Sequence, residues 1–327
     1  MTSLHLPKIA FTMGDPAGIG PEIIVRMLED HPEFAENAEL FIYGSPEVIR
    51  DAAGRFCKSP LPPCELVEAT GVKVSHLADG ILSSECGLAA YETVVRAAKD
   101  AVAGKIDAMV TAPVNKAAVC LNGIPFSGHT ELVAEICGTK DFAMMQSAGA
   151  LRIAFVTPHI ALSEVPAACT FDRIVRTAGL LHDAVRAEGI PEPRIAIAAI
   201  NPHAGENGNM GREDEDTVKP AVRRMNELGI HAEGPVPPDA LFVQSVLRKY
   251  DGIVSMYHDQ GHIPFKMLAF DRGVNSTLGL PIIRTSMDHG TAFNIAGQGI
   301  ADFGSLAEAF RIALKRASAK IQNTLQQ

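Results

Sequence analysis

Short apolar segments recur along the chain, and most of them are apolar at every position rather than at alternate positions. A strand that is apolar throughout is buried on both faces, as in a parallel sheet that helices cover on each side. The segments of this kind are Ile9–Met13, Leu40–Tyr43, Ala108–Thr111, Ile153–Thr157, Ile195–Ile200, Ile253–Tyr257 and Pro281–Thr285. They predict the strands of a mainly parallel sheet.

Longer segments in which apolar residues follow a helical spacing lie between the predicted strands. They are Gly87–Gly104, Asp172–Glu188, Glu213–Gly229, Asp239–Lys249 and Ser305–Ile321. This alternation predicts an α/β fold with helices on both faces of the sheet. The 327 residues suffice for two domains, yet no linker divides the chain. We therefore expect a discontinuous first α/β domain of residues 1–125 plus 270–327 and a second α/β domain of residues 126–269.

The composition argues against two classes of partner. Lys and Arg number 29 against 38 Asp and Glu, without a basic stripe, so we expect no nucleic-acid partner. No segment has the roughly 18 consecutive apolar residues that span a bilayer, and no secretion signal is visible, so we expect a cytoplasmic protein without a membrane partner. The six cysteines form no C-x-x-C pair and are expected to be reduced thiols.

Three histidines, His159, His203 and His258, each follow one of the predicted strands. The carboxyl ends of parallel strands meet at the edge of a sheet where ligands bind, so the three imidazoles could converge there. Three protein ligands with an open fourth position are typical of a catalytic divalent-metal site. The alternative is that each histidine is only a polar residue at the end of a strand.

A fourth histidine, His262, stands four residues after His258, a spacing that would suit two ligands on one face of a helix. Gly261 and Pro264 favour a loop at this point, because both residues interrupt regular structure. We therefore do not count His262 among the ligands.

A glycine-rich turn follows the first predicted strand. Gly14, Gly18 and Gly20 precede Pro21, which suits the first turn of a helix. Backbone N–H groups at such a turn can bind an anion, but the spacing is neither G-x-G-x-x-G nor that of a P-loop. The turn either binds an anionic group or only shapes the backbone.

The stretch Gly128-His-Thr-Glu131 is a second candidate anion site. Thr130 or Ser127 could cap a helix that begins at Glu131. The hydroxyl of Thr130 and the imidazole of His129 at a helix N-terminus would suit a phosphate or a carboxylate. Capping by itself would explain these residues equally well.

Further polar candidates lie in the last third of the chain. Arg284 ends the predicted strand Pro281–Arg284, where its guanidinium could hold a carboxylate or phosphate through two hydrogen bonds. Lys266 and Asn275 belong to the same polar set. A glycine-rich loop, residues 288–302, follows and would allow close approach of its backbone to a ligand.

Taken together, the motifs resemble one family over essentially the whole chain. The stretches that carry the resemblance are Gly14–Pro21, Gly128–Glu131, Asn201–Glu206, Met256–Gly261, Gly273–Asn275, Gly279–Thr285 and Asp288–Ala292. They are similar to the 4-hydroxythreonine-4-phosphate dehydrogenase family of pyridoxal phosphate biosynthesis, including its 4-phospho-D-threonate and 4-phospho-D-erythronate dehydrogenase paralogues.

The resemblance implies a homodimer with shared active sites, in which two α/β/α domains flank a cleft as in isocitrate and isopropylmalate dehydrogenases. It implies that the first domain is the cofactor side and that the second is the metal and dimer side. It implies one divalent metal (Zn, Co, Ni, Mn or Mg) per active site, with the ligands His159, His203 and His258. It implies substrate contacts at His129, Thr130, Lys266, Asn275 and Arg284. More loosely, it implies that NAD, or NADP, contacts Asp288, Gly290, Thr291, Ala292 and Asn294.

The implied reaction is NAD-dependent oxidation of a 4-phosphorylated 3-hydroxy acid, of the 4-phosphohydroxy-L-threonine type, followed by decarboxylation. The metal would act as a Lewis acid that lowers the pKa of the substrate hydroxyl, and the nicotinamide ring would accept a hydride. Lys266 and Asp259 are the candidates for the general base.

The segment His262-Ile-Pro-Phe-Lys266 differs from the biosynthetic pattern and is similar to the paralogues that handle 4-phospho-D-threonate or 4-phospho-D-erythronate. It is also similar to diol dehydrogenases of aromatic catabolism. The biosynthetic and the catabolic substrate therefore both stay open. Outside this class, the alternatives are a metal-dependent hydrolase or lyase that uses the three histidines without NAD, and a non-catalytic binding protein.

Overall fold

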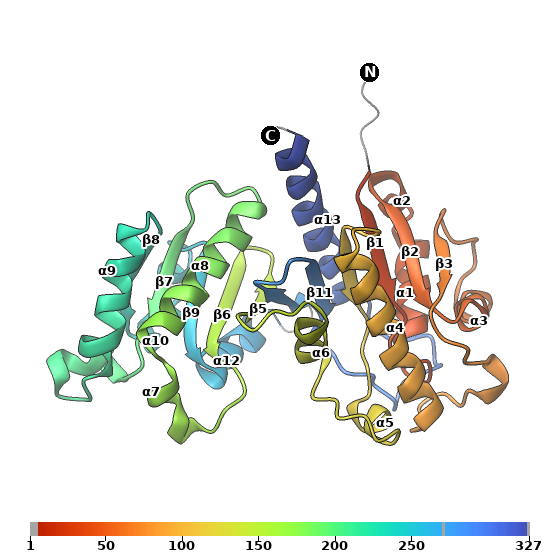
Figure 1. Ribbon diagram of the computed structural model, residues 1–327, viewed down its shortest axis with the longest axis horizontal. Coiled ribbons are helices and arrows are strands. Elements are labelled where there is room, and N and C mark those ends of the chain that lie inside the picture. Colours follow the sequence, from red (N-terminus) through yellow and green to blue (C-terminus); the bar gives the residue numbers. More distant parts are fainter. Residues whose placement is uncertain (1–5, 270–271, 326–327) are drawn as a thin grey trace. The chain divides into compact units, whose positions relative to one another are not determined.

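The structure is a computed structural model, which describes residues 6–269 and 272–325 (Figure 1). The chain divides into two compact units. The first unit comprises Met1–Lys140 and Leu280–Gln327, and the second comprises Asp141–Gly279. Compared with the bounds expected from the sequence, residues 126–140 lie in the first unit and residues 270–279 in the second.

The first unit has a parallel sheet with the strand order β3-β2-β1-β4-β11. The strands are β1 Lys8–Thr12, β2 Glu39–Gly44, β3 Glu65–Glu68, β4 Ala108–Thr111 and β11 Ile283–Met287. The helices are α1 Gly20–Asp30, α2 Phe34–Asn37, α3 Pro46–Phe56, the short η1 Val74–His76, α4 Ser84–Val102, α5 Lys116–Cys120, α6 His129–Ile136 and α13 Gly304–Leu325.

Helices cover both faces of this sheet. Neighbouring residues of a strand point to opposite faces, and in β1 the side chain of Ala10 packs in a core cluster with Val94 of α4. The next residue, Phe11, stacks on Phe310 of α13 with 5.6 Å between ring centroids. Strand β1 is therefore buried on both sides, as its uniformly apolar sequence predicts.

The second unit has a mixed sheet with the strand order β10-β5-β6-β9-β7-β8. Strand β5 is antiparallel to both β10 and β6, and the remaining pairs are parallel. The strands are β5 Ala143–Ala148, β6 Leu151–Thr157, β7 Arg194–Ala198, β8 His231–Val236, β9 Gly252–Tyr257 and β10 Val274–Leu278. The helices are η2 Leu162–Glu164, α7 Val165–Ala168, α8 Phe171–Ala187, η3 Pro202–Gly208, η4 Asp214–Val218, α9 Lys219–Glu227, α10 Pro238–Leu241, α11 Gln244–Leu247 and α12 His258–Ala269.

The α/β class is confirmed, and all seven segments predicted as strands form strands. The segment 239–249 is not one helix but two short ones, α10 and α11, and the segment 213–229 divides into η4 and α9. The likeness to isocitrate and isopropylmalate dehydrogenases stays a prediction.

None of the helices in the described parts of the chain combines the length and the apolar character needed to cross a membrane.

The expectation of a loop after His258 is wrong, because residues 258–269 form the helix α12 with Pro264 inside it. A Cβ atom at Gly261 would lie 2.6 Å from Cε1 of Phe155 in β6. Gly261 is therefore the residue that allows α12 to lie against the sheet, and it does not end the helix.

Candidate functional site

Arg284 lies near the start of β11, not at its carboxyl end as the sequence predicts. Its side chain nevertheless reaches the last residue of β4: Nη2 donates a 2.8 Å hydrogen bond to Oγ1 of Thr111, and Nη1 donates a longer one, 3.4 Å, to Oγ1 of Thr130. Arg284 is only 3% exposed, and this burial lowers its pKa to about 10. The guanidinium is therefore a buried cation at neutral pH.

His129 lies beside this cation at the first position of α6. The expected cap is wrong: α6 begins two residues before Glu131, its N-cap is Gly128, and no side chain caps it. Burial, and secondarily the charges of Arg284 and Lys116, lower the pKa of His129 to about 3, so the ring is neutral at pH 7. Its Nε2 is buried and, among the described residues, has no hydrogen-bond partner.

A buried polar atom without a partner is uncommon in proteins and often marks the place of a ligand or a water molecule. In the first unit such an atom, Nε2 of His129, accompanies a buried guanidinium and the hydroxyl of Thr130. This combination suits a phosphate or a carboxylate, since arginine binds both through charge-assisted hydrogen bonds. The family resemblance implied His129, Thr130 and Arg284 together as substrate contacts, but the sequence gave no sign of Thr111.

Two glycines of the turn after β1 lie where neighbouring backbone leaves no room for a side chain. Gly14 has a φ of +74°, and a Cβ there would lie 2.5 Å from the carbonyl oxygen of Pro113. At Gly20 a Cβ would lie 2.1 Å from the carbonyl oxygen of Met13. As expected, Pro21 stands in the first turn of α1. Close backbone packing thus accounts for these two glycines without a bound anion.

The same turn contains Asp15, a buried carboxyl group that sequence reasoning did not single out. Its Oδ1 accepts a 3.0 Å hydrogen bond from the backbone N–H of Ala17, and the backbone N–H groups of Ala17 and Asn115 partly offset the effect of burial on its pKa. Burial raises the pKa of Asp15 to about 6. A carboxyl group in an apolar turn was the available signal in the sequence.

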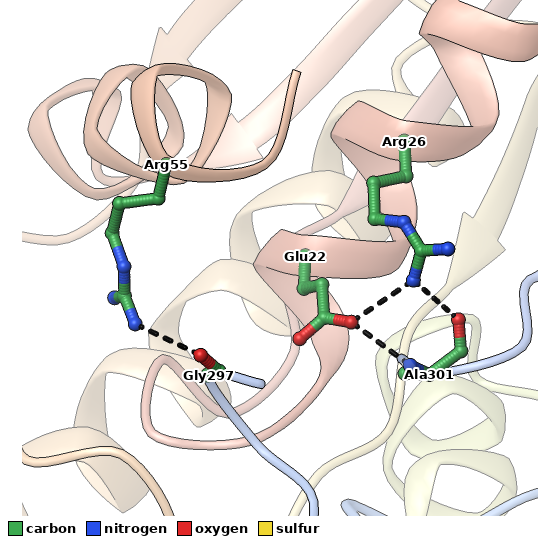
Figure 2. A network of polar contacts seen from close by, with 5 residues as sticks. All are labelled: Glu22, Arg26, Arg55, Gly297 and Ala301. Atoms are coloured by element: carbon green, nitrogen blue, oxygen red, sulfur yellow. Dashed lines mark hydrogen bonds and ion pairs between the residues drawn. The ribbon is translucent and has the colours of Figure 1, made fainter. Parts of the chain in front are cut away.

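The glycine-rich loop expected to contact the cofactor is held against the helices of the first unit (Figure 2). Arg26 donates a 2.7 Å hydrogen bond to the carbonyl oxygen of Ala301, and Oε1 of Glu22 accepts one of 2.9 Å from the N–H of Ala301. Figure 2 also shows Arg55 of α3 reaching the carbonyl oxygen of Gly297, at 3.5 Å. The loop is anchored by its backbone at both places.

The residues expected to contact NAD occupy the first part of this loop. The carbonyl oxygen of Thr291 accepts a 3.1 Å hydrogen bond from the N–H of Ile19, and the N–H of Asp288 donates to Ser305. Asn294 is exposed, and space is open beside Gly290 where a side chain would stand. Ala292 has a φ of +44°, which is uncommon for a residue with a side chain. A nucleotide would meet mainly backbone and small side chains here.

In the second unit, the parallel strands β6, β9 and β7 are neighbours, so their carboxyl ends lie at one edge of the sheet. His159 lies two residues after β6, and His258 follows β9 directly as the first residue of α12. The ring centroids of His159 and His258 are 5.9 Å apart. His203 is five residues beyond the end of β7, in the segment η3.

The backbone around His203 is left-handed. The φ angles of residues 203–207 lie between 42° and 74°, and four of these residues carry side chains. Each such residue costs roughly 1–2 kcal/mol, and strain of this kind is often found at functional sites. The buried Asp214 supports the segment, because its carboxylate accepts hydrogen bonds from the N–H groups of Ile200 (2.8 Å) and Asn201 (2.9 Å).

His258 has two further neighbours. Its Nδ1 lies 2.7 Å from Oδ1 of Asp259, and the ring of His262 stacks on its own ring with a centroid distance of 3.9 Å. Burial, and secondarily the nearby His258, lower the pKa of His262 to about 4. Asp259, expected as a candidate base, is mostly exposed and is bonded to His258. It can therefore orient this imidazole.

The arrangement fits part of a metal site. A metal ion that binds two imidazoles at about 2.1 Å per nitrogen brings their ring centres to roughly 5–6 Å, the separation of His159 and His258. Among the described residues of one chain, no group of three or more His, Cys, Asp or Glu side chains could hold a metal ion. One chain therefore brings two of the three expected imidazoles together, and the full set stays a prediction.

The last two expected substrate residues also lie in the second unit. Lys266 is half-buried on α12, and burial lowers its pKa. Asn275 lies on β10 in register with Gln146, and its buried Oδ1 has no hydrogen-bond partner within the described ranges. Both side chains have properties suited to binding, and their roles stay predictions.

Proteins of one family match this chain over most of its length. The family described as pyridoxal phosphate biosynthetic protein PdxA matches residues 36–313. A 4-hydroxythreonine-4-phosphate dehydrogenase from Desulforapulum autotrophicum is 41% identical, over 95% of this chain and 96% of its own. A D-threonate 4-phosphate dehydrogenase from Bordetella bronchiseptica is also 41% identical, over 97% of this chain and 93% of its own.

A solved structure agrees with these relatives. The crystal structure of 4-hydroxythreonine-4-phosphate dehydrogenase from Klebsiella pneumoniae superimposes with a TM-score of 0.83 at 38% identity, and the match covers 95% of this chain and 99% of that one. The chain is therefore an oxidoreductase of the dehydrogenase class. It belongs to the pyridoxal phosphate biosynthetic protein PdxA family.

Proposed function

We propose that this enzyme oxidises the hydroxyl group of a 4-phosphorylated 3-hydroxy acid with NAD, and that decarboxylation follows. The substrate we propose is 4-phosphohydroxy-L-threonine or a close analogue. The observation that carries the proposal is the buried guanidinium of Arg284 beside the unpartnered Nε2 of His129. The names of the relatives support a phosphorylated hydroxy acid.

In this proposal the first unit binds the anionic part of the substrate. Arg284 stays charged at neutral pH and donates to a phosphate or carboxylate oxygen, while an N–H group of its Nη2 donates to Thr111. His129 is neutral, so it forms a hydrogen bond to the substrate without adding charge. Thr130 offers a hydroxyl group at the same helix terminus. Such groups hold the substrate in one orientation, which favours reaction by proximity.

We propose that His159, His203 and His258 hold a divalent metal, with His203 completing the set in a homodimer. When bound, the metal would act as a Lewis acid on the substrate hydroxyl, and NAD would accept the hydride. Lys266, with its lowered pKa, is our candidate for taking up the hydroxyl proton. Asn275 would form a hydrogen bond to the substrate through its unpartnered Oδ1.

The homodimer is supported by the surface of α12, the helix that carries His258. Ile263, Met267 and Leu268 are large apolar residues that are 56%, 82% and 49% exposed in the single chain. Apolar side chains at these exposures are typical of surfaces that another chain covers. We also propose that the enzyme is cytoplasmic. Its six cysteines are all free, which is in keeping with a reducing compartment.

A second substrate, 4-phospho-D-threonate, has specific support. The D-threonate 4-phosphate dehydrogenase from Bordetella bronchiseptica is as similar to this chain as the first relative named above, at 41% identity. The two substrates differ in the amino or hydroxyl group beside the carboxylate, while the phosphate is common to both. The phosphate-binding role of the first unit is therefore the same for either substrate.

The test is NADH formation, followed by absorbance, from each of the two substrates with metal-replete and chelator-stripped protein. Turnover of 4-phosphohydroxy-L-threonine that is lost with the metal would support the biosynthetic assignment. Turnover of 4-phospho-D-threonate alone would assign the catabolic one. Absence of NADH from both, with metal present, would contradict the proposal and favour a hydrolase or lyase.

Two variants distinguish a loss of substrate binding from a general loss of structure. Arg284→Lys keeps the charge but loses the planar pair of donors, so we expect KM for the substrate to rise at least tenfold. Arg311→Lys, in a partly exposed ion pair with Glu308 on α13, is the matched control and should behave as the unmodified enzyme. Equal KM values for both variants would argue against substrate binding by Arg284.

A further inference from the structure

The imidazole of His262 makes two separate contacts with His258, the predicted metal ligand at the start of α12. The two rings are nearly parallel, with an interplanar angle of 8° and 3.9 Å between centroids. In addition, Nδ1 of His262 lies 3.1 Å from the backbone carbonyl oxygen of His258. A carbonyl oxygen only accepts hydrogen bonds, so Nδ1 of His262 is the donor and carries a hydrogen.

The sheet holds the other face of the His262 ring. Phe155 of β6 is 1% exposed and stacks on His262 with 4.3 Å between centroids. Gly261 allows this approach, since any larger residue would collide with Phe155. The rings of Phe155, His262 and His258 therefore form one continuous stack from the sheet to the carboxyl end of β9.

The stack excludes His262 as a second ligand of the ion that His258 would bind. A metal bonds to an imidazole nitrogen along a lone pair in the plane of the ring. Two parallel rings nearly 4 Å apart have lone pairs in separate planes, which do not meet at one ion about 2.1 Å from both nitrogens. His262 can therefore affect this metal site only through its contacts with His258.

Asp259 completes the support of His258. Its carboxylate accepts a hydrogen bond from Nδ1 of His258 at 2.7 Å, which leaves Nε2 as the nitrogen with a lone pair. Within the described residues this Nε2 forms no hydrogen bond. The hydrogen bond to Asp259 sets the tautomer, and the stack on His262 restricts rotation of the ring.

We propose that His262 is a positioning residue, which with Asp259 holds the His258 imidazole in the orientation and tautomer that present Nε2 to a divalent metal. This inference rests on the proposed function, because it assumes that His258 binds a metal. Hydrogen-bonded partners such as Asp259 orient metal ligands in many proteins, and their loss typically weakens metal binding by about 10- to 100-fold. We expect the loss of a stacked partner to act in the same direction.

The test measures metal affinity of the full chain by competition with a chromophoric chelator, and the visible absorption spectrum of the cobalt(II)-loaded protein. His262→Leu removes both the stack and the hydrogen bond, so we expect the dissociation constant for Zn²⁺ or Co²⁺ to rise about tenfold or more. His262→Phe keeps a stacking ring and loses only the hydrogen bond, so its constant should lie between those of His262→Leu and the unmodified chain. The cobalt spectrum of His262→Leu should change, because the geometry of the His258 ligand changes.

The control is His231→Leu, the same substitution at an exposed histidine in β8, which should leave affinity and spectrum unchanged. Metal binding by His262→Leu as tight as that of the control, with the same spectrum, would overturn the inference. Should His262→Leu fail to fold, His262→Phe decides: affinity and spectrum identical to the unmodified chain would overturn the role of the hydrogen bond. An unmodified chain that binds no metal would overturn the proposed metal site, and this inference with it.

Discussion

The guanidinium of Arg284 and the hydroxyl of Thr111 are joined by a 2.8 Å hydrogen bond between side chains 173 residues apart in the sequence. The two residues lie on the adjacent parallel strands β11 and β4. Because Arg284 is buried, one of its five N–H donors depends on Thr111 for a partner. The contact therefore fixes where the remaining donors of the guanidinium point.

Thr111→Val should remove this acceptor while it keeps the shape of the side chain. A buried charged donor then loses its partner, which costs about 1–3 kcal/mol. We expect a lower free energy of unfolding and a KM for the phosphorylated substrate that is higher by roughly tenfold. Thr111→Ser retains the hydroxyl and is the control. Equal effects of the two substitutions, in denaturant unfolding and in KM, would argue against the hydrogen bond as the cause.

Asp15→Asn should change the pH dependence of stability. The pKa of Asp15 in the folded chain is about 6, above the ordinary value of 3.8, so the folded state favours the protonated form. Its contribution to stability is complete below about pH 4 and is lost as the pH rises to about 6 and beyond. Asparagine never ionises and can keep the hydrogen bond from Ala17. We expect the variant to be more stable than the unmodified chain at pH 8 by about 3 kcal/mol.

Urea unfolding at pH 4 and at pH 8 measures this effect. The difference between Asp15→Asn and the unmodified chain should be small at pH 4 and large at pH 8. A difference that is the same at both pH values would mean that ionisation of Asp15 is not its cause.

Gly87→Ala should destabilise the fold although alanine is the better helix former. Gly87 lies in α4, and a Cβ there would stand 2.1 Å from the backbone carbon of Ala118 in α5. We expect the free energy of unfolding to fall by about 2 kcal/mol or more, because the backbone of α4 or α5 must move to make room for the added Cβ. Gly179→Ala in α8 meets nothing within 4 Å and should instead stabilise by about 0.5–1 kcal/mol. Thermal and denaturant unfolding measure the change in stability of each variant. If both variants were stabilised, or both were destabilised, the packing argument would be contradicted.

Glu22→Gln should loosen the loop of residues 288–302. The amide keeps an oxygen for the N–H of Ala301 but loses the charge that pairs with Arg26 at 3.1 Å. We expect faster hydrogen exchange at the Ala301 amide, measured by mass spectrometry on peptides of this loop. Arg212→Gln breaks an exposed ion pair elsewhere and should leave exchange in the loop unchanged. Unchanged exchange in Glu22→Gln would show that the charge of Glu22 does not hold the loop.

Much of the fold could be predicted from local sequence. Short uniformly apolar runs are typical of strands buried on both faces, and the segments that begin at Ile9 and Ile253 are correctly predicted as strands. The apolar pattern does not predict the four strands β3, β5, β8 and β10. Strands β5 and β10 are partly polar: β5 contains Gln146 and Ser147, and β10 contains Asn275. Their antiparallel pairing is a long-range relationship that no local pattern encodes.

The helix α12 is the clearest case in which local rules failed. Glycine and proline within a short segment indicate a loop when nothing else is known. Packing against Phe155 reverses this expectation, because only glycine at position 261 lets a helix approach β6 so closely. The stacked pair of His258 and His262 follows from that helix, since residues four apart share one face.

The sequence by itself determined the α/β class, the buried strands and the residue types that could hold a metal and an anion. These depend on composition and on spacing over a few residues, which local chemistry governs. Only the tertiary structure decided that Thr111 bonds to Arg284, that His129 is buried beside a cation, and that His262 stacks on His258 while His203 lies in a left-handed turn. These relationships depend on burial and on contacts between distant segments, and such contacts exist only once the chain has folded.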